Sequence, residues 1–386
     1  MFGIGTLSLL IFYTMIGPTI SFAIIAIVLA FITSLLVTVY KAEISPTTLS
    51  KDLSLIKKAF DTDAILASIP TQRDVISYYT KTTDRDYKLL ELFVGPGLHT
   101  RLCVNYPILH HTCNARQVMY VLNALAGVHA VKNQKSNGKA VVVKTNVLEI
   151  GIGHGFCTLM LAGLLPRDEF EFYGMDVVKR HVDIAKKDGV KYPNVHFHIG
   201  DAAAASSFRN MAPQPPSFDL IFGVESFCHI DTTDRMNTLF SNVATHLTTD
   251  GRLIIVDGFR SENFSQSPPD QQLAMRLAER AFGIQKIHPM SQWIEAAYPV
   301  GLELKRLEDL TAQALPFWTF GWRFAHAIIH HAPAWVIRRL RAAPFIARST
   351  DNLLAVATVA HAMQNRAAAV YGVMVFAKKG GGVTEM

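Results

Sequence analysis

A turn with three alternate glycines, Gly151, Gly153 and Gly155, constrains the fold of this chain more than any other feature. An apolar, largely β-branched stretch at 141–148 leads into the turn, and an apolar helical pattern follows at 156–165. This order of strand, glycine turn and helix is typical of the opening of a nucleotide-binding βα unit. Side chains at the glycine positions would obstruct both the turn and the close approach of a ligand.

Carboxylates follow the apolar stretches that predict further strands. Such stretches alternate with helical segments, which predicts a parallel sheet with right-handed crossovers; they lie at 170–175, 195–199, 218–224 and 252–257. Ligands bind these sheets at the carboxyl ends of the strands, where Glu149, Asp176, Asp201 and Glu225 fall. Asp176 lies about 20 residues beyond the glycine turn, a position from which a carboxylate accepts hydrogen bonds from ribose hydroxyls.

Three of these carboxylates have a structural alternative. Glu149 and Asp176 can each cap a helix, and Asp201 can cap a helix or close a turn, because aspartate and related side chains accept hydrogen bonds from free backbone N–H groups. Asp219 begins the fourth predicted strand at the opposite end from the site, so we interpret it as structural.

The spacing Glu149-x-Gly151-x-Gly153-x-Gly155 differs from the G-x-G-x-x-G of dinucleotide-binding dehydrogenases. It resembles the first motif of class I S-adenosylmethionine-dependent methyltransferases. The resemblance implies an α/β, Rossmann-like fold with a mostly parallel seven-stranded sheet flanked by helices, and S-adenosyl-L-methionine as cofactor. It also implies that Glu149 holds the methionine part above the glycine turn. Asp176 then faces the ribose, and Asp201 and Ala202 lie beside the adenine.

Other stretches resemble the branch that includes sterol, tocopherol and cyclopropane-fatty-acid methyltransferases. The positions carried over are Tyr79, Tyr87 and His99, which line the substrate pocket in that branch, and the Glu225-x-x-x-His229 loop, which lies where the methyl group meets its acceptor. The chain departs from the branch at Thr80 and Arg85, which leaves the substrate class open. The alternative is that the aromatic residues are ordinary packing residues.

The predicted catalytic residues are His229, Glu225 and Tyr79. The intrinsic pKa of histidine is near neutrality, so His229 is the best-placed base for an oxygen or nitrogen acceptor. A carbon acceptor would generate a cation, which Glu225 and nearby aromatic faces would stabilise. The sequence does not choose between these chemistries, and His229 could instead serve only as a hydrogen-bonding loop residue.

The first forty residues are strongly apolar. Residues 2–40 contain no Asp, Glu, Lys, Arg or His. About 20 apolar residues cross a bilayer, so Thr19–Tyr40 predicts a transmembrane helix. Residues 2–16 would form a second span, a re-entrant segment or an extension of the same helix; the alternative is a buried helix. The lysines after the segment favour a cytosolic catalytic domain, anchored to the endoplasmic reticulum or another organelle membrane.

Four regions are expected: an anchor at 1–42, a helical cap at 43–140, a cofactor-binding core at 141–260, and lid helices with the last strands at 261–386. Within the last region, residues 317–346 combine tryptophans and arginines without acidic residues, which is typical of an interfacial membrane helix or of a packed lid helix. No nucleic-acid-binding module is recognised despite the net charge of +6, and no metal site is predicted because the four cysteines lack C-x-x-C spacing.

These observations predict an enzyme that transfers a methyl group to a lipophilic small molecule at a membrane bilayer. The acceptor classes are a sterol, a prenyl-quinol or tocopherol-like compound, another isoprenoid, or a fatty acyl lipid. One alternative is an N-methyltransferase of a polar amine or phospholipid headgroup. The other is a non-catalytic scaffold that keeps the fold. The sequence leaves the oligomeric state open.

Overall fold

The computed structural model describes residues 18–80, 116–135, 144–211, 217–343 and 346–380, with side chains from Leu29 onward. The expected pocket residues Tyr87 and His99 lie outside this part of the chain. Its centre is a seven-stranded sheet in the order β3-β2-β1-β4-β5-β7-β6. The strands are β1 (Thr145–Ile150), β2 (Phe170–Asp176), β3 (Val195–Ile199), β4 (Phe218–Val224), β5 (Leu247–Arg260), β6 (Leu302–Asp309) and β7 (Ala369–Lys378). Strands β1 to β5 pair in parallel, and β7 runs antiparallel to both β5 and β6.

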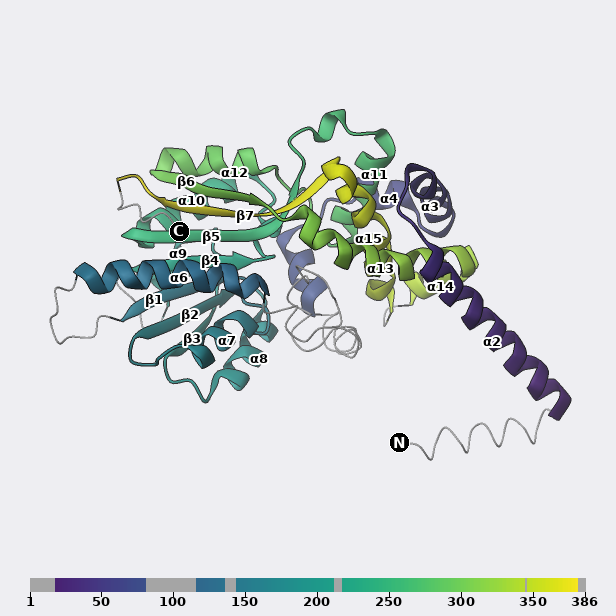
Figure 1. Cartoon of the computed structure of the whole chain (residues 1–386), viewed down its shortest axis with the longest axis horizontal. Coiled ribbons are helices and arrows are strands. Elements are labelled where there is room, and N and C mark those ends of the chain that lie inside the picture. The colour runs from purple at the N-terminus through teal and green to yellow at the C-terminus, as the bar shows by residue number, and fades with distance from the viewer. Residues whose placement is uncertain (1–17, 81–115, 136–143, 212–216, 344–345, 381–386) are drawn as a thin grey trace.

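Helices cover both faces of the sheet, as Figure 1 shows. One face carries α6 (Arg116–Lys135), α7 (Phe156–Leu164) and α8 (Lys179–Gly189), and the other carries α9 (Ala205–Arg209), α10 (Thr233–His246) and α12 (Met290–Ala297). Successive side chains of a strand point to opposite faces. Val147 therefore joins the core under α6 and α7, while Leu148 joins the core under α10 and α12. Both residues are fully buried, as expected for a sheet covered on two sides.

A block of helices lies beyond the carboxyl ends of the parallel strands (Figure 1). It comprises α3 (Pro46–Ala59), α4 (Thr62–Ala67), α11 (Pro269–Ala281), α13 (Thr311–His331), α14 (Ala334–Ala342) and α15 (Ala347–Met363). The block has its own apolar core, to which α3 contributes Leu49, Leu53 and Ile56. An ion pair connects the block to the sheet, between Arg260, the last residue of β5, and Glu279 of α11. The carboxyl ends of the parallel strands therefore face these helices.

The predicted N-terminal transmembrane anchor is wrong. Within the described residues, no helix combines the length and the apolar character that crossing a bilayer requires. The apolar stretch forms α2 (Pro18–Lys41), whose second half contacts α13. Thr38 Oγ1 lies 2.8 Å from His331 Nε2, and the ring of Phe31 meets that of His331 edge-on at 6.1 Å.

The segment expected as an interfacial or a packed lid helix forms the second part of α13 and all of α14. Trp322 of α13 is fully buried, and its Nε1 donates a hydrogen bond to Asp52 of α3 at 3.0 Å. Trp335 of α14 is 63% exposed. A fully buried tryptophan cannot lie at the level of lipid headgroups, so α13 follows the packed-helix alternative.

Candidate active site

The glycine turn joins β1 to α7 at the carboxyl edge of the sheet. Gly151, Gly153 and Gly155 all have positive φ angles, of 73°, 52° and 82°, a region that glycine adopts without steric cost. A Cβ atom at Gly151 would lie 2.2 Å from Cβ of Ser226, in the loop after β4. The turn is also held from β2, because the Gly151 N–H donates to the carbonyl of Met175 at 2.7 Å. The sequence pattern and the backbone therefore agree at this turn.

Glu149 and Asp176 both accept hydrogen bonds from the backbone around the turn. The Glu149 carboxylate accepts from the N–H and the hydroxyl of Thr158, at 2.9 and 2.5 Å, so it caps the first turn of α7. Asp176 accepts from the N–H groups of Gly153 at 2.9 Å and Val178 at 2.8 Å. The capping alternative is thus present for Glu149, whereas Asp176 closes a turn before α8, whose N-cap residue is Val178. A carboxylate has about four acceptor positions, so Asp176 keeps capacity for a ligand hydroxyl.

Asp201 and Ala202 follow β3. Asp201 accepts hydrogen bonds from Gln72 at 2.8 Å and pairs with Arg235 at 3.1 Å, and it also closes a turn by accepting from the Ala203 N–H. Gln72 belongs to the helical segment 72–80, which Asp201 thereby ties to the sheet. Ala202 is buried, and its carbonyl accepts from Asn242. Both oxygens of the Asp201 carboxylate already accept hydrogen bonds, so the expected contact with adenine would use an oxygen that also has a protein partner.

Glu225 begins the loop after β4 in a left-handed conformation, with a φ of 53°. One carboxylate oxygen accepts hydrogen bonds from Tyr371 Oη at 2.7 Å and Gln117 Nε2 at 2.8 Å. These partners come from β7 and α6, and sequence reasoning missed both because they are more than a hundred residues from Glu225. Burial and the Glu225 carboxylate raise the pKa of Tyr371 well above its usual value, so its phenol remains a donor.

Tyr79 and His229 meet in the space between the helical segment 72–80 and the sheet. The Tyr79 hydroxyl oxygen lies 2.8 Å from His229 Nε2, and the two rings are nearly perpendicular. Burial lowers the pKa of His229 to about 4, so the ring is neutral at physiological pH. The other ring nitrogen, Nδ1, is buried and has no hydrogen-bond partner among the described residues. Two of the predicted catalytic residues are therefore in direct contact.

Two further histidines extend this pair, and sequence reasoning did not select them. The ring of His181 lies 5.5 Å from that of Tyr79 and 5.2 Å from that of His154. His181 Nδ1 is also 3.4 Å from an oxygen of Asp176. Both histidines carried a signal in the sequence. His154 stands inside the glycine motif, and His181 follows Asp176 by five residues, which brings it onto the first turn of α8.

The loop that carries Glu225 and His229 is anchored on Asp257 of β5. This carboxylate accepts from the N–H groups of Cys228 at 3.0 Å and Gly258 at 2.7 Å. Burial raises the pKa of Asp257 to about 6, and burial together with Asp257 raises the pKa of the Cys228 thiol well above its usual value. Each of these shifts favours the uncharged form, so the surroundings of the loop solvate charge poorly.

The residues at this edge fit an S-adenosylmethionine-sized ligand in three respects. The three glycines of the turn carry no side chain, and carboxylates stand at the carboxyl ends of the adjacent strands β1 and β2. The buried Nδ1 of His229 is an unused polar atom in the same region. When bound, the ligand would supply an electrophilic methyl group; Asp176 and the turn would hold it.

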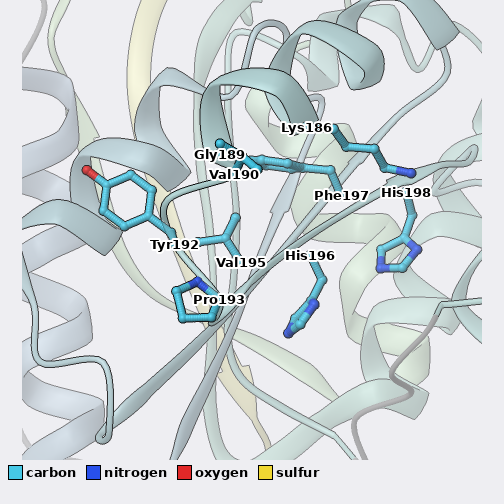
Figure 2. Close-up of a pocket in the computed structure, with 9 residues that line it drawn as sticks. All are labelled: Lys186, Gly189, Val190, Tyr192, Pro193, Val195, His196, Phe197 and His198. Atoms are coloured by element: carbon cyan, nitrogen blue, oxygen red, sulfur yellow. The ribbon is translucent and has the colours of Figure 1, made fainter.

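A cavity of about 470 Å³ lies elsewhere, as Figure 2 shows. Its walls come from the end of α8 and from β3, and they include Lys186, Tyr192, His196 and His198. Strand β3 is at the outer edge of the sheet. None of the predicted site residues lines this cavity, so we do not assign the chemistry to it.

Comparison with known proteins identifies the part of the chain that forms the site. Residues 147–251 match the sequence model of the methyltransferase domain. This segment contains the glycine turn, Asp176, Asp201, Glu225 and His229. No curated protein matches the chain. The predicted resemblance to methyltransferases is confirmed for this segment, and one solved structure of the same fold is a complex with S-adenosyl-L-homocysteine.

Solved structures share the fold at low sequence identity. The cyclopropane synthase MmaA2 of Mycobacterium tuberculosis is 15% identical with a TM-score of 0.57, and the match covers 81% of this chain and 100% of the synthase. Geranyl diphosphate C-methyltransferase of Streptomyces coelicolor A3(2) is 14% identical with a TM-score of 0.52, over 80% and 97%. The [4+2]-cyclase SpnF is 17% identical with a TM-score of 0.53, over 81% and 98%. These likenesses establish the fold.

Proposed function

From the premise that this chain is an S-adenosylmethionine-dependent methyltransferase of the class I fold, we propose that it methylates a lipophilic small molecule. One feature carries the proposal, which is the burial of the side chains around the loop 225–229. Asp257 is 2% and Tyr371 1% exposed, and burial lowers the pKa of His229 to about 4 and raises that of Asp257 to about 6. A site that solvates charge poorly suits an apolar acceptor better than an ionic one.

The contacts of the site suggest how its own residues would act. Methyl transfer is an in-line displacement, so the protein must align donor and acceptor and exclude water. His229 is neutral and hydrogen-bonded at Nε2 to Tyr79, and its buried Nδ1, which has no hydrogen-bond partner among the described residues, would face a hydroxyl of the acceptor. In the tautomer with the proton on Nε2, Nδ1 accepts the proton that an oxygen acceptor loses.

An acceptor that is methylated at carbon would use the same residues differently. A cation would form on the acceptor, and the ring faces of Tyr79 and His181 together with the Glu225 carboxylate would stabilise it. One structural neighbour, a geranyl diphosphate C-methyltransferase, is named for methylation of an isoprenoid at carbon. We therefore favour an isoprenoid acceptor over the other lipophilic classes.

Two alternatives remain as outcomes of the test. A polar amine or phospholipid headgroup is supported by the likeness to a phosphoethanolamine N-methyltransferase of Haemonchus contortus, and Glu225 would face the amine. A protein that keeps the fold without methyl transfer is supported by the likeness to a [4+2]-cyclase, since one fold hosts several chemistries.

The deciding experiment incubates the purified full-length chain with methyl-labelled S-adenosylmethionine and total lipid extract, followed by solvent partitioning. The proposal expects label in the organic phase, and mass spectrometry then identifies the product. A Gly151→Ala variant serves as the control that should transfer no label. Label that appears only with a soluble-metabolite extract would replace the lipophilic acceptor by a polar one. Cofactor binding without label in either phase would favour the non-catalytic alternative.

A further inference from the structure

We propose that Asp52, His326 and His330 form a binding site for a divalent transition-metal ion, with Zn²⁺ as the best fit. Asp52 lies on α3 and is 1% exposed. Its Oδ1 is 2.7 Å from His326 Nδ1 and 3.0 Å from His330 Nε2, both on α13. One ligand atom from each of the three residues lies within 4.8 Å of the other two. This cluster belongs to the helical block, apart from the residues of the candidate active site.

The local sequence explains why two imidazoles converge. His326 and His330 are four residues apart on one helix, so they occupy the same face, and their ring centroids are 4.0 Å apart. The third ligand comes from a helix 274 positions earlier in the chain. Sequence spacing alone therefore did not predict the site, because no local motif contains all three residues.

The distances are close to those of a coordinated ion. Zn²⁺ binds imidazole nitrogen at about 2.0–2.1 Å and carboxylate oxygen at about 2.0–2.2 Å, so ligand atoms in a tetrahedral site are separated by about 3.3 Å. The observed separations of 2.7 and 3.0 Å between Asp52 Oδ1 and the two nitrogens are slightly shorter. An outward shift of two of these side chains by a few tenths of an ångström would make room for the ion. Imidazole and carboxylate ligands suit Zn²⁺ better than Mg²⁺ or Ca²⁺.

The other carboxylate oxygen is held by a second set of contacts. Asp52 Oδ2 accepts a hydrogen bond from Trp322 Nε1 at 3.0 Å and lies 3.1 Å from His361 Nε2, on α15. Such partners orient a metal-bound carboxylate and are usual around metal sites. They leave Oδ1 directed at His326 and His330. Because His330 lies at the exposed rim of the cluster, an ion and a water ligand can reach it from solvent.

A bound ion would join α3 to α13. It would also stabilise the position of α15, because His361 of α15 and Trp322 of α13 both contact the other oxygen of Asp52. The competing explanation is a network of hydrogen bonds in which neutral imidazoles donate to a single carboxylate, with no ion. Both explanations use the same contacts, so they differ in one measurable respect, which is metal stoichiometry. This respect does not depend on methyltransferase activity.

The test uses the purified full-length chain, stripped with a chelator, then titrated with Zn²⁺ and separately with Co²⁺. We expect one ion per chain by elemental analysis after dialysis, a higher melting temperature with Zn²⁺, and the visible absorption of tetrahedral Co²⁺. His330→Gln should lose the ion and keep the circular dichroism spectrum, because His330 lies at the exposed rim. His331→Gln is the matched control, since this neighbouring histidine contacts Thr38 instead, and it should bind as wild type does.

Two results would overturn the proposal. The first is a wild-type chain that retains no Zn²⁺ or Co²⁺ after dialysis, which would leave the hydrogen-bond network as the explanation. The second is a His330→Gln variant that retains the ion and the Co²⁺ spectrum, which would place the binding elsewhere in the chain. An Asp52→Asn variant that folds should behave as His330→Gln does, because the amide is a poor metal ligand.

Discussion

At the scale of single residues, two features of Gly151 oppose a side chain, its backbone conformation and the nearness of Ser226. Its φ is 73°, and a Cβ atom would lie 2.2 Å from that of Ser226. We predict that Gly151→Ala abolishes cofactor binding and lowers the free energy of unfolding by about 1–3 kcal/mol, because the left-handed backbone is strained for alanine and the loop after β4 must move. Isothermal titration with S-adenosylmethionine and chemical denaturation measure both effects.

Gly258→Ala is the matched control for this substitution. Gly258 lies in β5 with nothing within 4 Å of the place that an alanine methyl group would occupy, and the N–H that it donates to Asp257 is kept. The Gly258→Ala variant should have the same affinity for S-adenosylmethionine and the same free energy of unfolding as the wild type. Wild-type cofactor affinity in Gly151→Ala would instead show that the turn does not contact the ligand.

His229 is predicted to act as a base, and its pKa determines the pH range in which it can do so. Burial lowers this pKa to about 4, so the base is unprotonated above about pH 5 and is lost as the pH falls through 4. We therefore predict that kcat/KM stays level from neutral pH down to about 5, where a histidine of ordinary pKa would already have caused a decline. His229→Ala should lower turnover about 100-fold or more while cofactor affinity changes little. A pH–rate profile and titration calorimetry measure these quantities.

His198 provides the control for the His229 prediction, because burial lowers its pKa to about 4 as well. It lies on β3 beside the cavity of Figure 2, whose lining residues do not include Tyr79 or His229. His198→Ala should leave turnover and the pH profile unchanged. Unchanged turnover in His229→Ala would remove His229 as the base, and an acid limb near pH 6.5 in kcat/KM would show that His229 has an ordinary pKa in the free enzyme.

The residues that sequence reasoning found and missed differ in how far their partners lie along the chain. Glu149 and Asp176 lie at the carboxyl ends of β1 and β2, so a period-two pattern and a glycine turn were enough to place them. Gln117, Tyr371 and His181 contribute through contacts that only the folded sheet creates. The motif also could not show that Asp201 is paired with Arg235, because that partner comes from α10, which follows β4.

At the scale of elements, one buried ion pair connects the sheet to the helical block. Arg260 Nε donates to Glu279 Oε1 at 2.7 Å, and the same oxygen accepts from the Ile287 N–H. Glu279 is 1% exposed. We predict that Glu279→Gln lowers the free energy of unfolding by about 3 kcal/mol, because it leaves the Arg260 charge uncompensated in a buried place. Urea denaturation followed by tryptophan fluorescence measures the change.

Glu303→Gln is the control, because it removes the same charge from an exposed pair with Lys305 on β6. Solvent screens such a pair, and the unfolding transition should not move. A similar loss in both variants would indicate an effect of net charge, and no loss in Glu279→Gln would mean that Arg260 finds another partner.

Whole elements were predictable where the hydrophobic pattern had one physical meaning. Alternation of β-branched strands with helices and a glycine turn predicted the parallel sheet, and the last strands were expected within 261–386, where β6 and β7 lie. Apolar character alone was ambiguous at the N-terminus. A run without charges is equally compatible with a bilayer and with packing against other helices, and in α2 the contacts with His331 of α13 lie far away in sequence.

At the scale of the whole molecule, the N-terminal helices differ in how deeply they belong to the fold. Helix α3 places Leu49, Leu53 and Ile56 in the core of the helical block, each at most 3% exposed, and carries Asp52 into the histidine cluster. The described part of α2 is mostly exposed and contacts α13 at Thr38 and Phe31. The block covers the strand ends, so the stability of α3 is also a condition for a formed site.

Two truncations separate these contributions. A chain that starts at Lys41 should stay folded and keep its affinity for S-adenosylmethionine, with a slightly lower melting temperature. A chain that starts at Thr62 loses three buried aliphatic side chains, each contributing about 1.5–3 kcal/mol, a sum comparable with the total stability of a domain. It should aggregate or melt without a cooperative transition, because α11 and α15 then expose their apolar faces. Scanning calorimetry compares the two chains. A cooperative transition at the wild-type temperature in the shorter chain would show that the sheet and the rest of the block fold without α3. In that case α11, α13 and α15 alone would cover the carboxyl ends of the strands.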